Sequence, residues 1–350
     1  PRLTRLLREL ALVAQMTAPY AAGAVPANLI SFPPRADSGW SSASWRDSGA
    51  GYAGGRYGMD VNAIWAPHAL ESIAGILAIV RTLGLSTDSI ARVRPDVMSG
   101  QLGLYARDSA ALRRAIETWW GASRHFVVRL EPDQVRSRVA ARLAAMPAAE
   151  RDYWSNVVAS SGADRDSLVF LAVSLDASGQ PIGVANTDPA TRLFLGDRGD
   201  AAAVQEALRD VRVFVRAYPV GLLIDQAGPV AANDAYAPAP VWQAFVRDHY
   251  HGPRVVWGRE VNLFLAGVAS RIAAARGTPL ARHVPELRAA LERVQAAADA
   301  SGFQSELWSY EIRDGRLVPV RYGISSDVQL WSTTDLAVQF ALSRLPAEVR

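Results

Sequence analysis

The chain has 350 residues, half of them hydrophobic, and a formal net charge of only +3 at neutral pH. This length is enough for a substantial core in one large domain or two ordinary ones. The absence of cysteine and of lysine excludes disulfides, thiolate catalysis, cysteine-based zinc sites, Schiff-base chemistry and lysine phosphate anchors.

The predicted partners follow from charge and hydropathy. There is no basic tract with interleaved aromatic residues, which argues against nucleic acid as a partner. No apolar run approaches the roughly 20 residues that span a bilayer, so the sequence predicts a soluble protein without a membrane partner. The compartment stays open between the cytoplasm and the periplasm of a bacterium. Because the chain does not begin with Met, we expect it to start inside a longer gene product or after processing.

Amphipathic helices dominate the predicted secondary structure, because apolar residues recur at three- and four-residue spacing. They are expected over residues 3–16, 61–83, 109–120, 133–146, 202–213, 241–248, 260–276, 279–300 and 334–345. Gly84 is expected to cap the second of them. The helix from Glu260 is rich in Ala and Leu, which predicts burial on more than one side.

Short strands are predicted between the helices. Residues 125–130 form one, residues 168–175 and 181–185 form a hairpin, and residues 308–312 and 316–322 form another with Asp314–Gly315 in its turn. Residues 31–55 and 227–240 are expected to be long loops. Since strands and helices do not alternate, the pattern argues against a Rossmann or TIM fold. The absence of an obvious linker favours a single domain over residues 1–350.

The first chemical motif surrounds Asp47, which follows Trp45 and Arg46 and precedes a glycine-rich loop. Such a loop lets the backbone approach a ligand closely, although Asp47 could equally cap a turn. Asp60 directly precedes the helix that starts at Val61 and is a favoured N-cap. Asn62 and Trp65 lie roughly on one face of that helix, and for Trp65 a structural role is the simpler interpretation.

Two further motifs lie in the middle of the chain. Asn186 and Asp188 close the first predicted hairpin, where Asn and Asp are ordinary turn residues. His251 stands between Tyr250 and Gly252, ahead of Trp257 and Glu260. The spacing of His249 and His251 does not suit a helical zinc site, so no metal is predicted.

The last motif contains Trp308 and Glu311, followed by Gln329 and Trp331, with Glu306 as a nearby alternative carboxylate. Like the first motif, it sets a carboxylate beside tryptophan and polar side chains. A sugar-cleaving site needs this mixture, because one carboxyl protonates the leaving oxygen, another activates water, and aromatic faces carry the sugar rings.

Taken in order, these motifs resemble the C-terminal glucosidase domain of glycogen-debranching enzymes, the amylo-α-1,6-glucosidase type, within the six-hairpin (α/α)6 glycosidases. The resemblance rests on Trp45–Asp47 with Asp60–Trp65, on Tyr250–Gly252 with Trp257, and on Tyr310–Gly315 with Gln329–Ser332, about a quarter of the chain. It implies a mostly α fold, an (α/α)6 toroid of helical hairpins with short β-hairpins in the loops. Asp47 comes earlier than the family's acid, so either the first helices lie on an upstream segment or the barrel is unusual.

The resemblance implies an inverting glycoside hydrolase acting on an oligo- or polysaccharide, with Asp47 as general acid, Glu311 as general base and no cofactor. Asp47 would then need a pKa raised by burial, which the neighbouring Arg46 would oppose. The substrate-binding residues that it implies are Trp45, Arg46, Asp60, Asn62, Trp65, Asn186, Asp188, His251, Trp257, Trp308, Gln329 and Trp331.

Other functions stay open. One is a glycan phosphorylase or transglycosylase of the same fold, in which phosphate or a sugar replaces water. Another is a non-catalytic glycan-binding protein, and a third is a helical scaffold without a ligand. A facing pair of carboxyls would favour the hydrolase over the binder, and dispersal of the tryptophans through the core would favour the scaffold.

Overall fold

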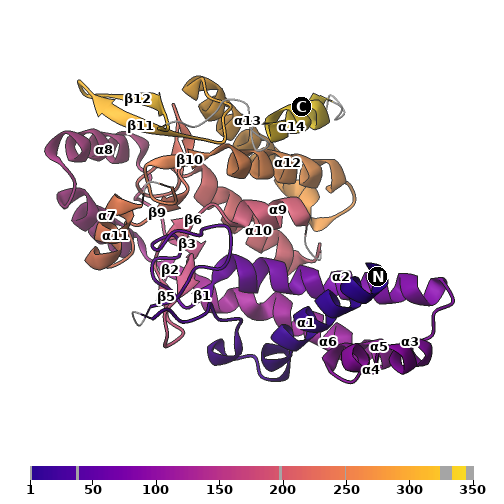
Figure 1. Ribbon diagram of the computed structural model, residues 1–350. Coiled ribbons are helices and arrows are strands. Elements are labelled where there is room, and N and C mark those ends of the chain that lie inside the picture. The colour runs from indigo at the N-terminus through magenta and orange to yellow at the C-terminus, as the bar shows by residue number, and fades with distance from the viewer. Residues whose placement is uncertain (1, 37–38, 197–198, 249, 324–332, 344–350) are drawn as a thin grey trace. The chain divides into compact units, whose positions relative to one another are not determined.

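The computed structural model describes residues 2–36, 39–196, 199–248, 250–323 and 333–343 of the chain (Figure 1). It is mostly helical with small antiparallel sheets, which confirms the predicted class. Contacts group the chain into two compact units. Unit 1 contains Pro1–Ser44, Gly55–Phe126 and Ser174–Pro181, and unit 2 contains Trp45–Gly54, Val127–Val173 and Ile182–Arg350.

Unit 1 is built on three long helices, with α6 packed against α1 and α2. The Tyr20 and Trp119 rings meet with centroids 4.6 Å apart, and Trp119 Nε1 donates to the Thr17 carbonyl at 2.9 Å, which fixes α1 to α6. The α-helices of this unit are α1 (Arg2–Ala22), α2 (Ala66–Thr82), α3 (Thr87–Val93), α4 (Pro95–Met98), α5 (Gln101–Arg107) and α6 (Ser109–Trp120). The 3₁₀ helices η1 (Pro26–Asn28) and η3 (Gly121–Phe126) and the strand β1 (Tyr57–Gly58) complete it.

The start of the second predicted helix differs from expectation. A π-helix, η2 (Val61–Trp65), runs into α2, and the predicted N-cap at Asp60 is wrong because this residue already has helical backbone angles and its side chain caps nothing. Its Oδ2 instead accepts a hydrogen bond of 2.5 Å from Ser44 Oγ. The end of the helix is as predicted, since Gly84 adopts φ +75° there.

The helical segment Val61–Thr82 is long and apolar enough to cross a membrane by length and composition, contrary to the sequence-based expectation that no such segment exists. However, 44% of its most apolar window is buried inside the protein. Core helices of soluble proteins meet the same criteria of length and composition. Within the described residues only this one segment meets them, which is weak evidence and is consistent with a soluble protein.

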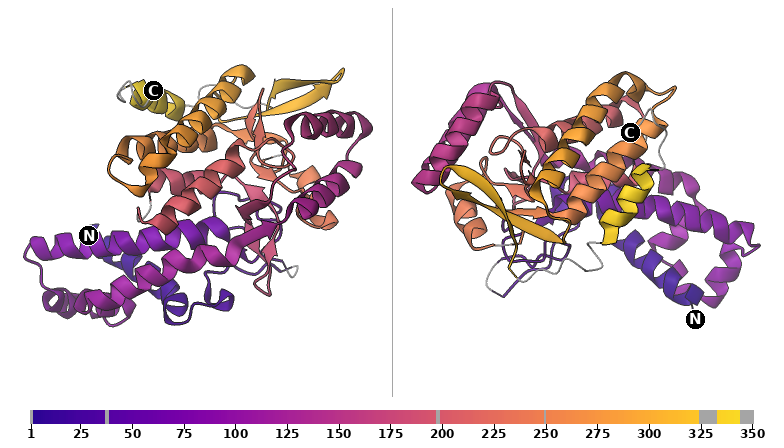
Figure 2. Two further views of the ribbon diagram at one scale, coloured as in Figure 1. Left: turned by 180° about the vertical axis from the view of Figure 1, so that it is seen from behind. Right: turned by 90° about the horizontal axis from the view of Figure 1, so that it is seen from above.

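Unit 2 carries the remaining long helices, and α12 and α13 lie side by side in it (Figure 2). Helices α9 and α13 pack on α12, and Phe264 of α12 stacks on Phe214 of α10 with centroids 4.5 Å apart. As predicted, α12 is buried on several sides. The helices are α7 (Pro132–Ala144), α8 (Ala148–Ser161), α9 (Pro189–Leu195), α10 (Ala201–Val215), α11 (Ala239–Arg247), α12 (Gly258–Ala274), η4 (Pro279–His283), α13 (Val284–Ser301) and α14 (Thr333–Ser343).

The strands are short and antiparallel. Strand β11 (Leu307–Arg313) pairs with β10 (Val255–Trp257) and β12 (Arg316–Arg321), and β2 (Val127–Leu130) pairs with β3 (Leu168–Leu171). The predicted β11–β12 hairpin is confirmed, with φ of +51° at Asp314 and +71° at Gly315. The other strands are β4 (Ser174–Leu175), β5 (Pro181–Ile182), β6 (Ala185–Asn186), β7 (Leu223–Ile224), β8 (Gly228–Pro229) and β9 (Ala232–Asn233).

The first predicted hairpin is only partly correct. Its leading strand divides in two, because β3 pairs with β2 while β4 joins β1 and β5 in another sheet. Long-range pairing therefore overrides the local pattern that suggested a simple hairpin. Five helices were not predicted, and most of them are short or lack a strong apolar period: α3, α4, α5, α8 and α9.

Candidate functional site

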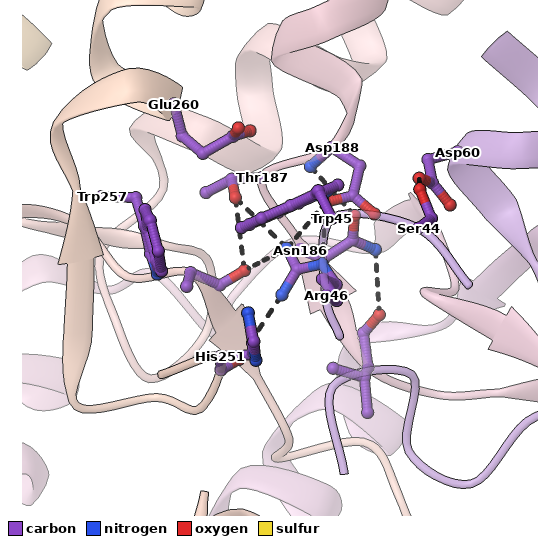
Figure 3. Close-up of polar contacts among 12 residues, drawn as sticks. Ser44, Trp45, Arg46, Asp60, Asn186, Thr187, Asp188, His251, Trp257 and Glu260 are labelled. Atoms are coloured by element: carbon purple, nitrogen blue, oxygen red, sulfur yellow. Dashed lines mark hydrogen bonds and ion pairs between the residues drawn. The ribbon is translucent and has the colours of Figure 1, made fainter. Parts of the chain in front are cut away.

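A buried cluster in unit 2 joins four segments that lie far apart in the sequence (Figure 3). They are the loop at Trp45–Ser48, the turn Asn186–Asp188, the segment at His251 and the start of α12 at Glu260. The turn is built by Asn186, whose side-chain oxygen accepts the Asp188 N–H at 3.1 Å while its amide donates to the Leu171 carbonyl at 3.0 Å. This Asx-turn places Asp188 directly ahead of α9.

Arg46 and Asp188 form a fully buried ion pair. Asp188 Oδ1 lies 2.8 Å from Nε and 2.7 Å from Nη2 of Arg46, and it also accepts the Trp45 indole N–H at 3.1 Å. Burial alone would lower the pKa of Arg46, but the charge and the hydrogen bond of Asp188, with smaller contributions from Tyr52 and Glu260, together outweigh it and the pKa is raised. Nη2 also donates to the Ala231 carbonyl at 2.8 Å. The pair therefore anchors the Trp45–Ser48 loop on unit 2.

The second oxygen of Asp188, Oδ2, is buried and has no hydrogen-bond partner in the described part of the chain. A buried carboxylate oxygen without a donor costs free energy, so its retention calls for an explanation. A proton or a hydroxyl group of a ligand would supply the missing donor.

Three aromatic rings pack beside this ion pair. His251 and Trp257 are nearly parallel, with an interplanar angle of 5° and centroids 6.0 Å apart. Both meet Trp45 edge to face, at 5.5 Å and 5.6 Å respectively. The guanidinium of Arg46 lies 4.3 Å from the Trp45 ring centroid, and that of Arg259 lies 5.2 Å from it. Trp45, Trp257 and Arg259 are partly exposed, so the aromatic group reaches the surface.

Glu260 is 1% exposed and carries the most unusual carboxyl of the cluster. Burial, with a smaller contribution from the charge of Asp188, raises its pKa to about 7, although Arg259 and Arg46 oppose the shift. Arg259 Nη1 lies 2.9 Å from Oε1 as an ion pair, but within the described residues neither carboxyl oxygen accepts a well-directed hydrogen bond. Figure 3 shows this carboxyl pointing to the side where Trp45 and Asp188 lie. Near neutral pH, Glu260 can therefore both hold and release a proton.

Ser48, Asp248 and His251 form a separate polar group beside the rings. Ser48 Oγ donates to Asp248 Oδ2 at 2.5 Å and lies 2.9 Å from His251 Nδ1. Burial would raise the pKa of Asp248, but hydrogen bonds from His251 and Ser48 outweigh it and hold this pKa well below its usual range. In a serine-hydrolase triad the two ring nitrogens of histidine contact serine and aspartate separately, whereas here Nδ1 faces both. The group is therefore suited to holding His251 in place.

A second Asn–Asp turn in unit 2 provides an internal comparison. Strand β9 pairs with β6, so that Asn233 lies opposite Ala185. Asn233 accepts the Ala235 N–H, and Asp234 pairs with Arg142. Here both carboxylate oxygens are used, since Arg142 Nε donates to Oδ1 at 2.7 Å and Nη2 to Oδ2 at 3.2 Å. Asp234 is thus fully satisfied where Asp188 is not.

The structure brings together part of the predicted site. Members of the cluster that the sequence analysis had named as substrate-binding are Trp45, Arg46, Asn186, Asp188, His251 and Trp257. Trp308 lies elsewhere, buried in the core of unit 2 with its Nε1 donating to the Ala227 carbonyl at 2.7 Å. Asp60, Asn62 and Trp65 belong to unit 1, where Asn62 binds the backbone of Ile30 and Gly58. Gln329 and Trp331 lie outside the described residues.

The predicted catalytic residues, Asp47 and Glu311, are exposed and do not belong to the buried cluster. Glu311 is exposed on β11, where its Oε2 lies 2.7 Å from Arg313 Nε, and it faces Val318 across the hairpin. The structure gives Asp47 none of the burial that the acid role requires.

Glu260 is not among the site residues predicted from the sequence. The sequence nevertheless contained a signal for this residue. Glu260 is a carboxylate three residues after Trp257, on a helix predicted to be buried on more than one side. Among the described residues, no group of three histidine, aspartate or glutamate side chains is placed to hold a metal ion.

Comparisons with protein-family models, with curated proteins and with solved structures found no match to this chain.

Proposed function

We propose that the protein is an inverting glycoside hydrolase acting on an oligo- or polysaccharide, and that Glu260 is its general acid. The observation that carries the proposal is the environment of Glu260, a buried carboxyl whose pKa is raised to about 7 beside a second carboxyl and an aromatic group. Glycoside hydrolysis needs one carboxyl that remains protonated near neutral pH and another that does not.

Glu260 meets the requirement for the acid better than Asp47. It would donate its proton to the glycosidic oxygen as the bond between that oxygen and the anomeric carbon breaks. Water would attack the anomeric carbon from the opposite face and release a proton to the base. The oxygen of Asp188 that has no donor, Oδ2, is the candidate base, because it is available to accept that proton while Oδ1 stays bound to Arg46.

The aromatic group supports a carbohydrate ligand. Trp45 and Trp257 present partly exposed indole rings next to Glu260, and sugar rings stack on such faces through their C–H groups. Because Glu260 is buried, binding requires the partly exposed Arg259 side chain to move away from its carboxyl. The (α/α)6 toroid belongs to the same proposal, and helical pairing such as that of α12 with α13 supports it.

The test is hydrolysis of a panel of α- and β-linked oligosaccharides by the purified protein, followed by proton NMR of the first product anomer. Glu260→Gln should lower kcat by about 10²–10⁴-fold while leaving substrate affinity measurable by calorimetry. Asp188→Asn should also abolish most turnover. Asp47→Asn and Glu311→Gln are the matched controls, since both replace an exposed carboxyl.

The outcomes separate the alternatives. If Asp47→Asn and Glu311→Gln lose activity while Glu260→Gln keeps it, Glu260 is not the acid and the pair implied by the sequence resemblance is correct. Turnover that requires inorganic phosphate and yields a sugar phosphate would identify a phosphorylase. Binding of oligosaccharides without any turnover would identify a glycan-binding protein.

A further inference from the structure

A cavity of about 820 Å³ in unit 2 is separate from the cluster around Glu260. Its wall is formed by α8, the segment 162–167, the end of α10, the loop that follows up to Gln226, and Arg293 of α13. None of the residues that form the Glu260 cluster lines it. Its volume is in the range of small-molecule sites.

Arg216 in this wall makes no direct ion pair within the described residues, although the carboxylates of Asp164 and of Asp166, which also lines the cavity, lie near enough to favour its charge. Its Nε, Nη1 and Nη2 donate to the carbonyls of Ala163, Ser167 and Asp166 at 2.7, 2.8 and 2.7 Å. Burial lowers the pKa of Arg216, and Tyr236 and the charges of Asp166 and Asp164 oppose this only in part. Arginine nevertheless remains protonated at neutral pH. The cavity wall therefore holds a half-buried cation bound only to neutral carbonyl groups.

Two more arginines line the cavity, and both are exposed. Arg293 Nη2 is 3.1 Å from Asp225 Oδ1, and Arg212 makes a two-point pair with Glu286 at 2.6 and 3.1 Å. Exposed pairs of this kind contribute little free energy, so a ligand anion can compete with Asp225 for Arg293 at small cost. Tyr153 adds a partly buried aromatic ring, held edge to face against Trp154 at 4.8 Å.

We propose that this cavity binds a small anionic sugar, with its carboxylate or phosphate held by Arg293 and by the one Nη1 N–H of Arg216 that is not bound to a carbonyl, and its ring against Tyr153. Guanidinium groups suit planar carboxylates and phosphates, and aromatic faces suit sugar rings. The site does not depend on the hydrolase proposal, because it shares no residue with the Glu260 cluster.

The test is isothermal titration calorimetry of the full chain carrying Glu260→Gln, so that no turnover contributes heat. The probes are D-glucuronate, D-glucose 6-phosphate, D-glucose and inorganic phosphate. We expect one of the two anionic sugars to bind at least tenfold more tightly than D-glucose and than inorganic phosphate. The tighter of the two identifies the acidic group as carboxylate or phosphate. Equal affinity for D-glucose, equal affinity for inorganic phosphate, or no binding of either anionic sugar would overturn the proposal.

Substitutions in the cavity wall test whether the anionic sugar binds in this cavity. Arg216→Gln should weaken binding of the anionic sugar at least tenfold, but it also removes bonds that hold residues 163–167. Ser160→Trp is therefore the second variant, since it fills the cavity from the exposed side of α8 and breaks no bond to that segment. Ala149→Trp, exposed on the same helix and outside the cavity wall, is its control. Full affinity in Ser160→Trp would show that the sugar binds elsewhere.

Discussion

Asp188 directs one carboxylate oxygen to Arg46 and leaves the other without a donor. The contacts of Oδ1, at 2.7 and 2.8 Å, are those of a fully buried ion pair, and both side chains are excluded from solvent. Such a pair is costly to break from one side, because the remaining charge stays buried without its partner. The pair therefore has a structural role in addition to the proposed catalytic one.

Removing one partner of the Arg46–Asp188 pair should lower stability more than removing both partners. We expect Arg46→Met to lower the free energy of unfolding by about 3–5 kcal/mol, since Asp188 then lacks a cation. The double variant Arg46→Met with Asp188→Leu should recover part of that loss. Guanidinium denaturation followed by tryptophan fluorescence measures both. A loss below about 1 kcal/mol in the single variant would contradict the buried pair.

Glu260 should make stability depend on pH. Its pKa is raised from the ordinary 4.5 to about 7, so the folded state holds a proton that the unfolded state releases. This contribution is complete below pH 4.5 and is lost as pH rises through about 7, with a total of about 3 kcal/mol. Between pH 5 and 8 the wild type should therefore lose stability relative to Glu260→Gln, as measured by urea unfolding. Parallel pH curves for the two proteins would refute the assigned environment of Glu260.

Asp248 should make stability depend on pH in the opposite direction, with the loss at low pH. Its pKa is held below the ordinary value, so its contribution is complete above about pH 4 and is lost as the pH falls toward the folded-state pKa. We expect Asp248→Asn to destabilise the protein near neutral pH and to have a smaller effect at low pH. The acid limb of the stability curve measures this, and Glu311→Gln, which removes an exposed carboxylate, is the control.

Substitutions in the two Asn–Asp turns should distinguish an effect on stability from an effect on catalysis. Asp234→Asn breaks an ion pair whose two oxygens are satisfied, so it should lower stability and leave kcat of the folded protein within about twofold. Asp188→Asn should lower both. Thermal unfolding and turnover are measured on the same samples, and a selective loss of kcat in Asp234→Asn would contradict this division.

Gly267 should be intolerant of a methyl group. A Cβ there would lie 2.6 Å from the Leu193 carbonyl carbon and 2.7 Å from the Phe194 nitrogen, which are backbone atoms of α9. We therefore expect Gly267→Ala to lower Tm, although alanine ordinarily favours a helix by about 1 kcal/mol. Gly75→Ala in α2 is the matched control, because a Cβ there meets nothing within 4 Å, and it should raise Tm slightly. A rise in Tm for Gly267→Ala would show that α9 and α12 are less closely packed.

The sequence predicted the long helices well because their apolar periods are strong and local. The signals for the α12 helix and for the Asp-Gly turn of the β11–β12 hairpin lie in residues that are neighbours in the sequence. The prediction that Asp60 caps a helix was wrong, and its carboxylate instead binds Ser44. The prediction that β3 belongs to a local hairpin was wrong because this strand pairs with β2. Non-local contacts of this kind leave little trace in a local pattern.

The candidate site was predictable only in part for the same reason. Aromatic and polar residues flagged as unusual, such as Trp45 and Asp188, do meet in the fold. Glu260 was overlooked because its distinguishing property is burial beside another carboxyl, which depends on four distant segments coming together. Asp47 was favoured by its neighbours in the sequence, yet its side chain is exposed.

The division of the chain between its two units affects how the protein can be made. Trp45–Gly54 belongs to unit 2, although its sequence neighbours on both sides belong to unit 1. During synthesis Arg46 leaves the ribosome 142 residues before Asp188, and burial of either charge must wait for the other. A polypeptide beginning at Val127 would contain most of unit 2 and still lack the cation that Asp188 needs. A cut at Phe126 would therefore separate the two charges of this buried pair.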